Sequence, residues 1–83
     1  MIEITFNKEE NRAIAMDGNK IIGECVFLET NDTWNIVHTE VDRQYQGQGI
    51  ARKLVESVIE NAKNEGKKLV ADCSYAKRMI ENN

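Results

Sequence analysis

The sequence predicts an α+β fold in which an antiparallel sheet comes first and a long helix follows. Three observations support this prediction. Apolar residues mostly alternate with polar ones up to Val41, which is the period of half-buried strands. From about Gly49 to Glu65 they recur at steps of three and four, as in an amphipathic helix. Lys68 to Asp72 then reads as a buried strand, followed by a short final helix.

The first half of the chain is expected to form an antiparallel meander of four strands. Ile2, Ile4 and Phe6 alternate with polar residues in the first strand, and Arg12 to Met16 is a second, shorter one. Asp17-Gly18 is a strong hairpin signal, because both residues tolerate the positive φ of a tight turn. The third strand, Lys20 to Leu28, should therefore return antiparallel to the second.

The fourth strand begins at Trp34, which is expected in the core, and ends at Val41. Strict alternation places Trp34, Ile36 and His38 on one face of this strand. It places a second set on the other face: Asn35, Val37, Thr39 and Val41.

The long helix is expected to connect the fourth strand to a parallel fifth strand, because a strand, a helix and a strand in succession form a right-handed crossover. Gly66 suits the position after the helix end. Ser74 can cap the final helix, with Tyr75, Ala76, Met79 and Ile80 on its buried side. The apolar stripe of the long helix consists of Ile50, Ala51, Leu54, Val55, Val58, Ile59 and Ala62.

Composition indicates one small domain, residues 1–83, that resides in the cytoplasm. The net charge is −3, with 11 basic residues scattered among 14 acidic ones, so no nucleic-acid surface is expected. No apolar run approaches the roughly 20 residues that span a bilayer, and no signal-peptide pattern follows Met1. One histidine and two distant cysteines lack the spacing of a zinc site, so no metal is expected, and a reducing cytosol would keep both thiols free.

The segment between the fourth strand and the long helix is the most informative one. Glycines let phosphate oxygens approach the main chain, and the free N–H groups of a helix's first turn form an anion site. A diphosphate ligand is therefore expected. Arg52 stands where a dinucleotide fingerprint needs a small residue, and no Lys-Ser/Thr pair follows the last glycine as in a Walker loop. The segment reads Gln44-Tyr45-Gln46-Gly47-Gln48-Gly49-Ile50-Ala51.

These residues resemble the GNAT superfamily of acetyl-CoA-dependent N-acetyltransferases. The superfamily's Gln/Arg-x-x-Gly-x-Gly/Ala pattern is matched by Gln44, Gly47 and Gly49. The chain looks most like very short GNAT-like proteins, through His38-Thr39-Glu40-Val41 before the loop and Cys73-Ser74-Tyr75 after the fifth strand. The resemblance covers about Ile36 to Ile80.

The resemblance implies that acetyl-CoA, as co-substrate, lies in a cleft where the fourth and fifth strands splay apart. Its pantetheine arm would pair with the strand edge that ends near Val41, as an added strand would. Ser74 and Tyr75 would line the same cleft. Lys53, Lys77 and Arg78 could reach the 3′-phosphate or be solvated surface charges. The diphosphate would sit on the N–H groups of Gln46, Gly47, Gln48, Gly49, Ile50 and Ala51.

Cys73 and His38 are the candidate catalytic residues. A helix dipole after Cys73 would lower the pKa of its thiol, whereas the neighbouring Asp72 would oppose thiolate formation. Cys73 could accept acetyl or only line the thioester pocket, and His38 could be a base for the amine or for Cys73. The alternative is that Cys73 is a small buried hydrophobe and His38 a framework residue. Tyr75 could protonate the leaving thiolate, pack against the coenzyme or belong to the core.

The leading interpretation is an acetyltransferase that moves acetyl from acetyl-CoA to a primary amine of a protein or a small molecule. No helix is expected before the meander, whereas in full GNAT enzymes such helices build much of the acceptor site, so the acceptor groove is expected to be shallow or supplied by a partner. One alternative is a non-catalytic CoA-binding module that acts as a sensor or accessory subunit. Another is a purely structural interaction domain.

Overall fold

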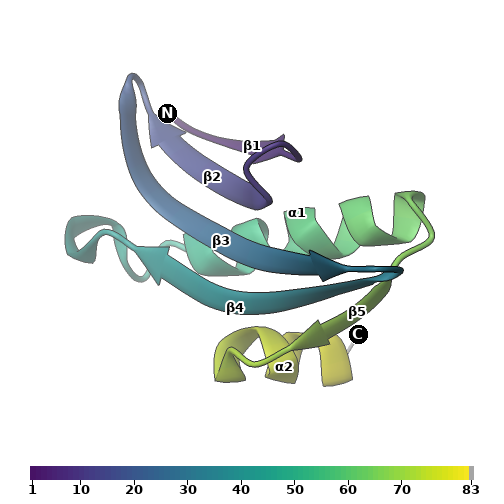
Figure 1. Cartoon of the computed structure of the whole chain (residues 1–83). Coiled ribbons are helices and arrows are strands. Elements are labelled where there is room, and N and C mark those ends of the chain that lie inside the picture. Colours follow the sequence, from purple (N-terminus) through teal and green to yellow (C-terminus); the bar gives the residue numbers. More distant parts are fainter. Residues whose placement is uncertain (83) are drawn as a thin grey trace.

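The computed structural model describes residues 1–82, and its centre is a five-stranded sheet in the order β1-β2-β3-β4-β5 (Figure 1). The first four strands are antiparallel neighbours and β5 is parallel to β4, so the predicted α+β fold is confirmed. The short η1 helix inside the loop was not predicted. The elements are β1 (Ile2–Asn7), β2 (Arg12–Asp17), β3 (Lys20–Thr30), β4 (Thr33–Val41), η1 (Arg43–Tyr45), α1 (Ile50–Asn64), β5 (Lys68–Ala71) and α2 (Ser74–Glu81).

Helix α1 packs across one face of the sheet and buries the apolar stripe that the sequence predicts. Of the predicted stripe only Ala51 is half-buried rather than buried. Trp34 is fully buried, as expected, and its ring stacks on Phe27 at a centroid distance of 4.3 Å. Within residues 1–82 no helix is long and apolar enough to cross a membrane.

Strand β4 is not regular, and the prediction that Trp34, Ile36 and His38 share one face is wrong. Val26 of β3 pairs with His38 and Phe27 pairs with Ile36, so Val37 has no partner of its own and forms a β-bulge. The bulge shifts the alternation by one residue. Thr39 therefore follows Ile36 on the face that α1 covers, and His38 lies on the opposite face.

Strands β4 and β5 pair only over a short stretch, from Thr33–Lys68 to Ile36–Ala71. At the end of this stretch the N–H groups of Asp72 and Cys73 both donate to the carbonyl oxygen of Ile36. Beyond that point β4 continues without β5, and Figure 1 shows the two strands diverging. The splayed pair that the family resemblance implied is therefore present.

The start of α2 differs from the prediction in two respects. Cys73, not Ser74, is the N-cap, because Cys73 has an extended backbone and its carbonyl accepts the first helical bond, from Lys77. Ser74 is exposed at the first helical position. Tyr75 is 41% exposed and does not lie on the buried side of α2. Ala76 is buried there as predicted.

Candidate functional site

The glycine loop precedes α1, at the end of β4. Gly47 and Gly49 have φ values of 84° and 78°, a left-handed conformation that residues with a Cβ adopt at a cost. Gly49 is also the N-cap of α1. A Cβ built on either glycine would meet no atom within 4 Å, so the space above the loop is open. A ligand can therefore approach the main chain of this loop.

The main-chain N–H groups at the start of α1 are available to a ligand. Gln46 is an exception and a correction, because its N–H already donates to the carbonyl of Arg43 across η1. From Gly47 to Ala51 no N–H group donates to any acceptor within residues 1–82. These donors lie at the positive end of the helix dipole, which makes them an anion site.

The loop is held at its base by two contacts that sequence reasoning missed. The Tyr45 hydroxyl donates to Oδ2 of Asp17, the last residue of β2, over 2.6 Å. Asp42 accepts from the main-chain N–H of Gln44 at 2.9 Å and so caps η1, while the Gln44 side chain is exposed. Tyr45 occupies a variable position of the Gln-x-x-Gly pattern, so the sequence contains no signal of its role.

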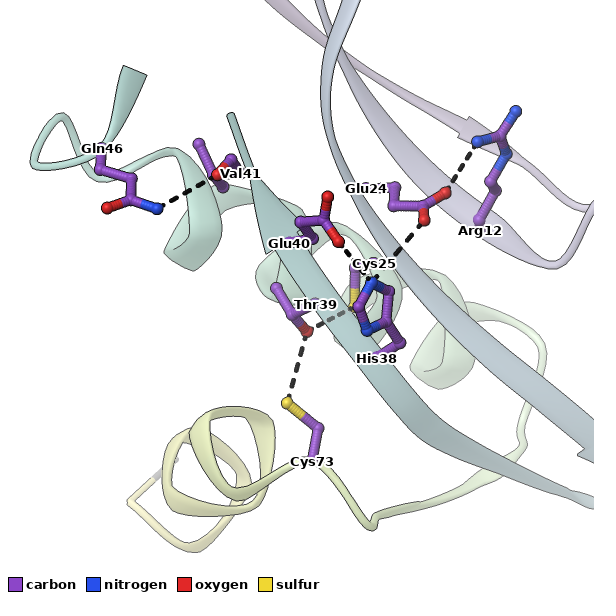
Figure 2. Close-up of polar contacts among 9 residues, drawn as sticks. All are labelled: Arg12, Glu24, Cys25, His38, Thr39, Glu40, Val41, Gln46 and Cys73. Carbon is purple, nitrogen blue, oxygen red and sulfur yellow. Dashed lines mark hydrogen bonds and ion pairs between the residues drawn. The ribbon is translucent and has the colours of Figure 1, made fainter. Parts of the chain in front are cut away.

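The edge of β4 beyond Ile36 is open on the side where β5 departs. The N–H of Asp42 donates to the carbonyl oxygen of Ile22 in β3. Main-chain groups of successive residues point to alternate sides of a strand. The N–H and C=O groups of Thr39 and Val41 therefore point away from β3, into the gap where β5 departs. The Val41 carbonyl accepts a hydrogen bond there from the side chain of Gln46 at 3.3 Å (Figure 2). The open edge and the glycine loop thus adjoin each other.

Cys73 lies beside the same open edge. Its Sγ is 3.7 Å from Oγ1 of Thr39, and it packs against the core while remaining half-exposed (Figure 2). Burial tends to raise the pKa of this thiol. The N–H of Ala76, the Thr39 hydroxyl and the N–H groups of Tyr75 and Thr39 outweigh burial, so the pKa lies below its usual value.

Asp72 does not prevent this lowering of the Cys73 pKa, contrary to what its position suggests. Its carboxylate accepts a hydrogen bond at 3.1 Å from the side-chain amide of Asn35. The Asp72 carboxylate is therefore directed toward Asn35 rather than toward the thiol.

His38 is not brought to Cys73, because the bulge at Val37 turns its ring to the face of the sheet that α1 does not cover. There its Nε2 is 3.1 Å from Oε1 of Glu40 and 3.9 Å from Oε2 of Glu24. Figure 2 shows His38 pointing toward these carboxylates and Thr39 toward the sulfur atoms. The expectation that His38 serves as a base for Cys73 is therefore wrong in geometry.

A groove of about 680 Å³ runs between α1 and α2. Its basic side chains are Arg52 and Lys63 on α1 and Arg78 on α2, and the exposed ring of Tyr75 forms part of its wall. Lys53 and Lys77 do not line it. The remaining lining residues are Glu56, Ile59, Glu60, Met79 and Asn82.

Comparison with protein families identifies the chain. Residues 11–83 match the family model described as GCN5-related N-acetyl-transferase. The chain belongs to this family. The family and the similar solved structures support N-acetyltransferase activity in general. A search of the curated proteins found no match.

Solved structures of the GCN5-related family resemble this member closely. A GCN5-like protein from Staphylococcus aureus, solved by NMR, is 35% identical, with 96% of this chain and 78% of that one covered and a TM-score of 0.73. A GNAT family acetyltransferase from Elizabethkingia anophelis, solved with acetyl-CoA bound, is 30% identical, with 86% and 50% covered and a TM-score of 0.67.

The fold is also shared by an enzyme of lower sequence identity. The ribosomal-protein-S18-alanine N-acetyltransferase from Escherichia coli shares 21% identity and a TM-score of 0.72, over 86% of this chain and 49% of that one. This family member therefore spans about half the length of the Elizabethkingia and Escherichia proteins. In the described part of the chain no group of three or more His, Cys, Asp or Glu side chains could hold a metal ion.

Proposed function

We propose that this chain binds acetyl-CoA and transfers its acetyl group to a primary amine. One observation supports this above all: the unpaired N–H groups from Gly47 to Ala51 adjoin the open edge of β4, and Cys73 lies beside the same edge. A diphosphate donor with an amide-bearing arm and a thioester matches these three features in order. The family supports the same conclusion.

The diphosphate fits the glycine loop. The N–H groups of Gly47, Gln48, Gly49, Ile50 and Ala51 have no other acceptor within residues 1–82, and the helix dipole favours negative charge at this point. The open space above Gly47 and Gly49 lets phosphate oxygens come within hydrogen-bond distance of the main chain. Gln46 contributes through its side chain only, because its N–H is occupied.

The pantetheine arm fits the open edge of β4. Amides of the arm bond the main-chain groups of Val41 and the carbonyl of Thr39, as an added strand does, while the Thr39 N–H stays directed at Cys73. The Gln46 side chain, which now bonds the Val41 carbonyl, yields to the arm. The groove between α1 and α2 has the size of a ligand pocket and offers Arg52 and Arg78 to phosphate and Tyr75 to an apolar or planar surface.

Cys73 is the proposed nucleophile. Its thiolate attacks the acetyl carbonyl carbon, the bond from that carbon to the coenzyme's sulfur breaks, and the coenzyme leaves as a thiolate that takes up a proton. A neutral amine then attacks the acetyl-cysteine, loses a proton and restores the thiol. His38 is a candidate to accept that proton only from an amine on the uncovered face of the sheet, beside Glu40 and Glu24.

A non-catalytic acyl-CoA-binding module is the second candidate. The position of His38 favours it, because the expected base faces away from the thiol. In this alternative Cys73 only lines the thioester pocket. The coenzyme contacts are the same for both candidates, so binding alone does not separate them.

The test combines intact mass, turnover and binding. The acetyltransferase proposal expects acetyl on Cys73 after incubation with acetyl-CoA alone, and amine-dependent release of coenzyme A across a panel of primary amines. Cys73→Ala should abolish both and keep coenzyme affinity. Binding without turnover for any amine, and without acetyl on the wild-type protein, would establish the module instead. At a coenzyme A concentration of 100 Kd, binding should stabilise the folded protein by about 2.7 kcal/mol. If coenzyme A causes no rise in melting temperature, both candidate functions are overturned.

A further inference from the structure

The hydroxyl of Thr39 lies between the two cysteines of the chain. Its Oγ1 is 3.6 Å from Sγ of Cys25 and 3.7 Å from Sγ of Cys73, both within hydrogen-bonding distance for sulfur (Figure 2). Thr39 and Cys25 are paired across β4 and β3 on the core face, and Cys73 reaches them from the end of β5. Side chains from β3, β4 and the N-cap of α2 thus form one hydrogen-bonded chain.

The direction of this chain depends on the charge of Cys73. A threonine hydroxyl has one hydrogen and two lone pairs. With a neutral thiol, Cys73 donates to Thr39 and Thr39 donates to Cys25. A Cys73 thiolate has no hydrogen to donate, so the Thr39 hydroxyl must turn its hydrogen to Cys73, and the freed lone pair is then open to the S–H of Cys25.

Cys25 suits the role of a donor that stays protonated while Cys73 ionises. It is fully buried in the core, and this burial raises the pKa of its thiol to about 11. It therefore keeps its hydrogen as the pH rises through the range in which the Cys73 thiol, whose pKa is lowered, ionises. A hydrogen bond to a charged group is stronger than one between neutral groups, so the reversed chain favours the thiolate.

We propose that Thr39 and Cys25 are positioning residues for Cys73, with the Cys25 thiol donating to the Thr39 hydroxyl and that hydroxyl donating to the Cys73 thiolate. The inference rests on the proposed function, in which this thiolate is the nucleophile. In this role neither side chain touches the reacting acetyl group, and the pantetheine arm meets only the main chain of Thr39. The β-bulge at Val37 places Thr39 between the two thiols, because without it the Thr39 side chain would point away from both sulfur atoms.

Other charged groups on the elements around Cys73 do not replace this contact. Asp72 bonds Asn35, and His38 with Glu40 and Glu24 lies on the other face of the sheet. The basic residues of α2 nearest in sequence, Lys77 and Arg78, are exposed. The Thr39 hydroxyl is therefore the side-chain donor to test first.

The experiment measures the pH dependence of Cys73 alkylation by iodoacetamide in the full chain, with peptide mapping to assign the label. Thr39→Val removes the hydroxyl and keeps the shape, Thr39→Ser keeps the hydroxyl, and Cys25→Ala removes the second donor. Thr5→Val, at an exposed position of β1, is the matched control. No acetyl-CoA is present, so the result does not depend on whether the chain is an acetyltransferase.

Thr39→Val should raise the alkylation midpoint by about one pH unit, which is tenfold less thiolate at a pH below the midpoint. Thr39→Ser should stay close to wild type, and Cys25→Ala should shift the midpoint in the same direction by less. An unmoved midpoint in Thr39→Val, or an equal shift in Thr39→Ser, would overturn the inference. If Thr39→Val does not fold, the Cys25→Ala midpoint decides, and a value equal to that of Thr5→Val rejects it. If the alkylation midpoints shift as expected but the protein transfers no acetyl group, the hydrogen-bonded chain is supported and only the proposed function is rejected.

Discussion

The Tyr45 hydroxyl donates a 2.6 Å hydrogen bond to the carboxylate of Asp17 and thereby ties the glycine loop to the end of β2. This bond lowers the pKa of the Asp17 carboxyl and raises that of the Tyr45 hydroxyl. The free N–H groups of the loop begin at Gly47, shortly after this anchor. The rigidity of the loop should therefore affect the affinity for the ligand.

Tyr45→Phe is expected to weaken coenzyme A binding several-fold, because a loosened loop must be ordered again when the ligand binds. Isothermal titration calorimetry measures the affinity, and a carboxyl NMR titration should show the Asp17 pKa rising toward its usual value. Asp17→Asn, which keeps an oxygen acceptor, should lose less affinity. Equal affinities for Tyr45→Phe and wild type would mean that the anchor does not order the loop.

Gly49→Ala should reduce both stability and coenzyme affinity. The left-handed backbone at Gly49 costs a residue with a Cβ about 1–2 kcal/mol, and the new methyl group stands in the open space above the N–H groups. Gly66→Ala is the matched control, since Gly66 has a φ of 68° and equally open surroundings at the far end of α1. It should lose similar stability in urea unfolding and keep full affinity. Parallel loss of affinity in both variants would contradict the site.

Glu29 should contribute to the acid sensitivity of the protein. Its carboxylate accepts hydrogen bonds from Lys8 and Trp34 and pairs with Lys67, and the first of these contributes most to lowering its pKa from 4.5 to about 2. A carboxyl with a depressed folded-state pKa stabilises the fold above the unfolded pKa. That stabilisation is lost as the pH falls from about 4.5 toward 2.

Glu29→Gln is therefore expected to make the free energy of unfolding fall less steeply over this pH range, as measured by urea unfolding at several pH values. Glu3→Gln is the control, because Glu3 is exposed and has no ion pair within residues 1–82. A wild-type slope in Glu29→Gln would show that the pairing is lost in solution.

Trp34→Ala should be the most destabilising change in the core. Trp34 is fully buried and stacks on Phe27 at 4.3 Å and on Phe6 at 5.8 Å. Truncation of a buried aromatic costs about 3–5 kcal/mol, which is a large part of the total stability of a domain this small. Trp34→Phe, which keeps a ring in the stack, should lose markedly less. Both losses are measured by urea denaturation, and similar values for the two variants would argue against the stack.

The elements themselves could be predicted from the sequence, because their signals are local. Alternation over a few residues predicted β1 to β3, and the apolar stripe predicted α1 within a residue of Ile50–Asn64. The glycine pattern predicted an anion loop, since φ values such as those of Gly47 and Gly49 depend on the residue type. Local chemistry of this kind needs no knowledge of the neighbouring strand.

The relations between elements were decided only by the tertiary structure. The bulge at Val37 arises from the pairing of β4 with β3, and no residue type in β4 predicts it. It separates His38 from Cys73 and brings Thr39 to a thiol 34 residues away in sequence. The sequence by itself thus determined the element types and the loop. Which side chains meet at the open edge was decided by register, because a shift of one residue in a strand reverses the face of every residue that follows.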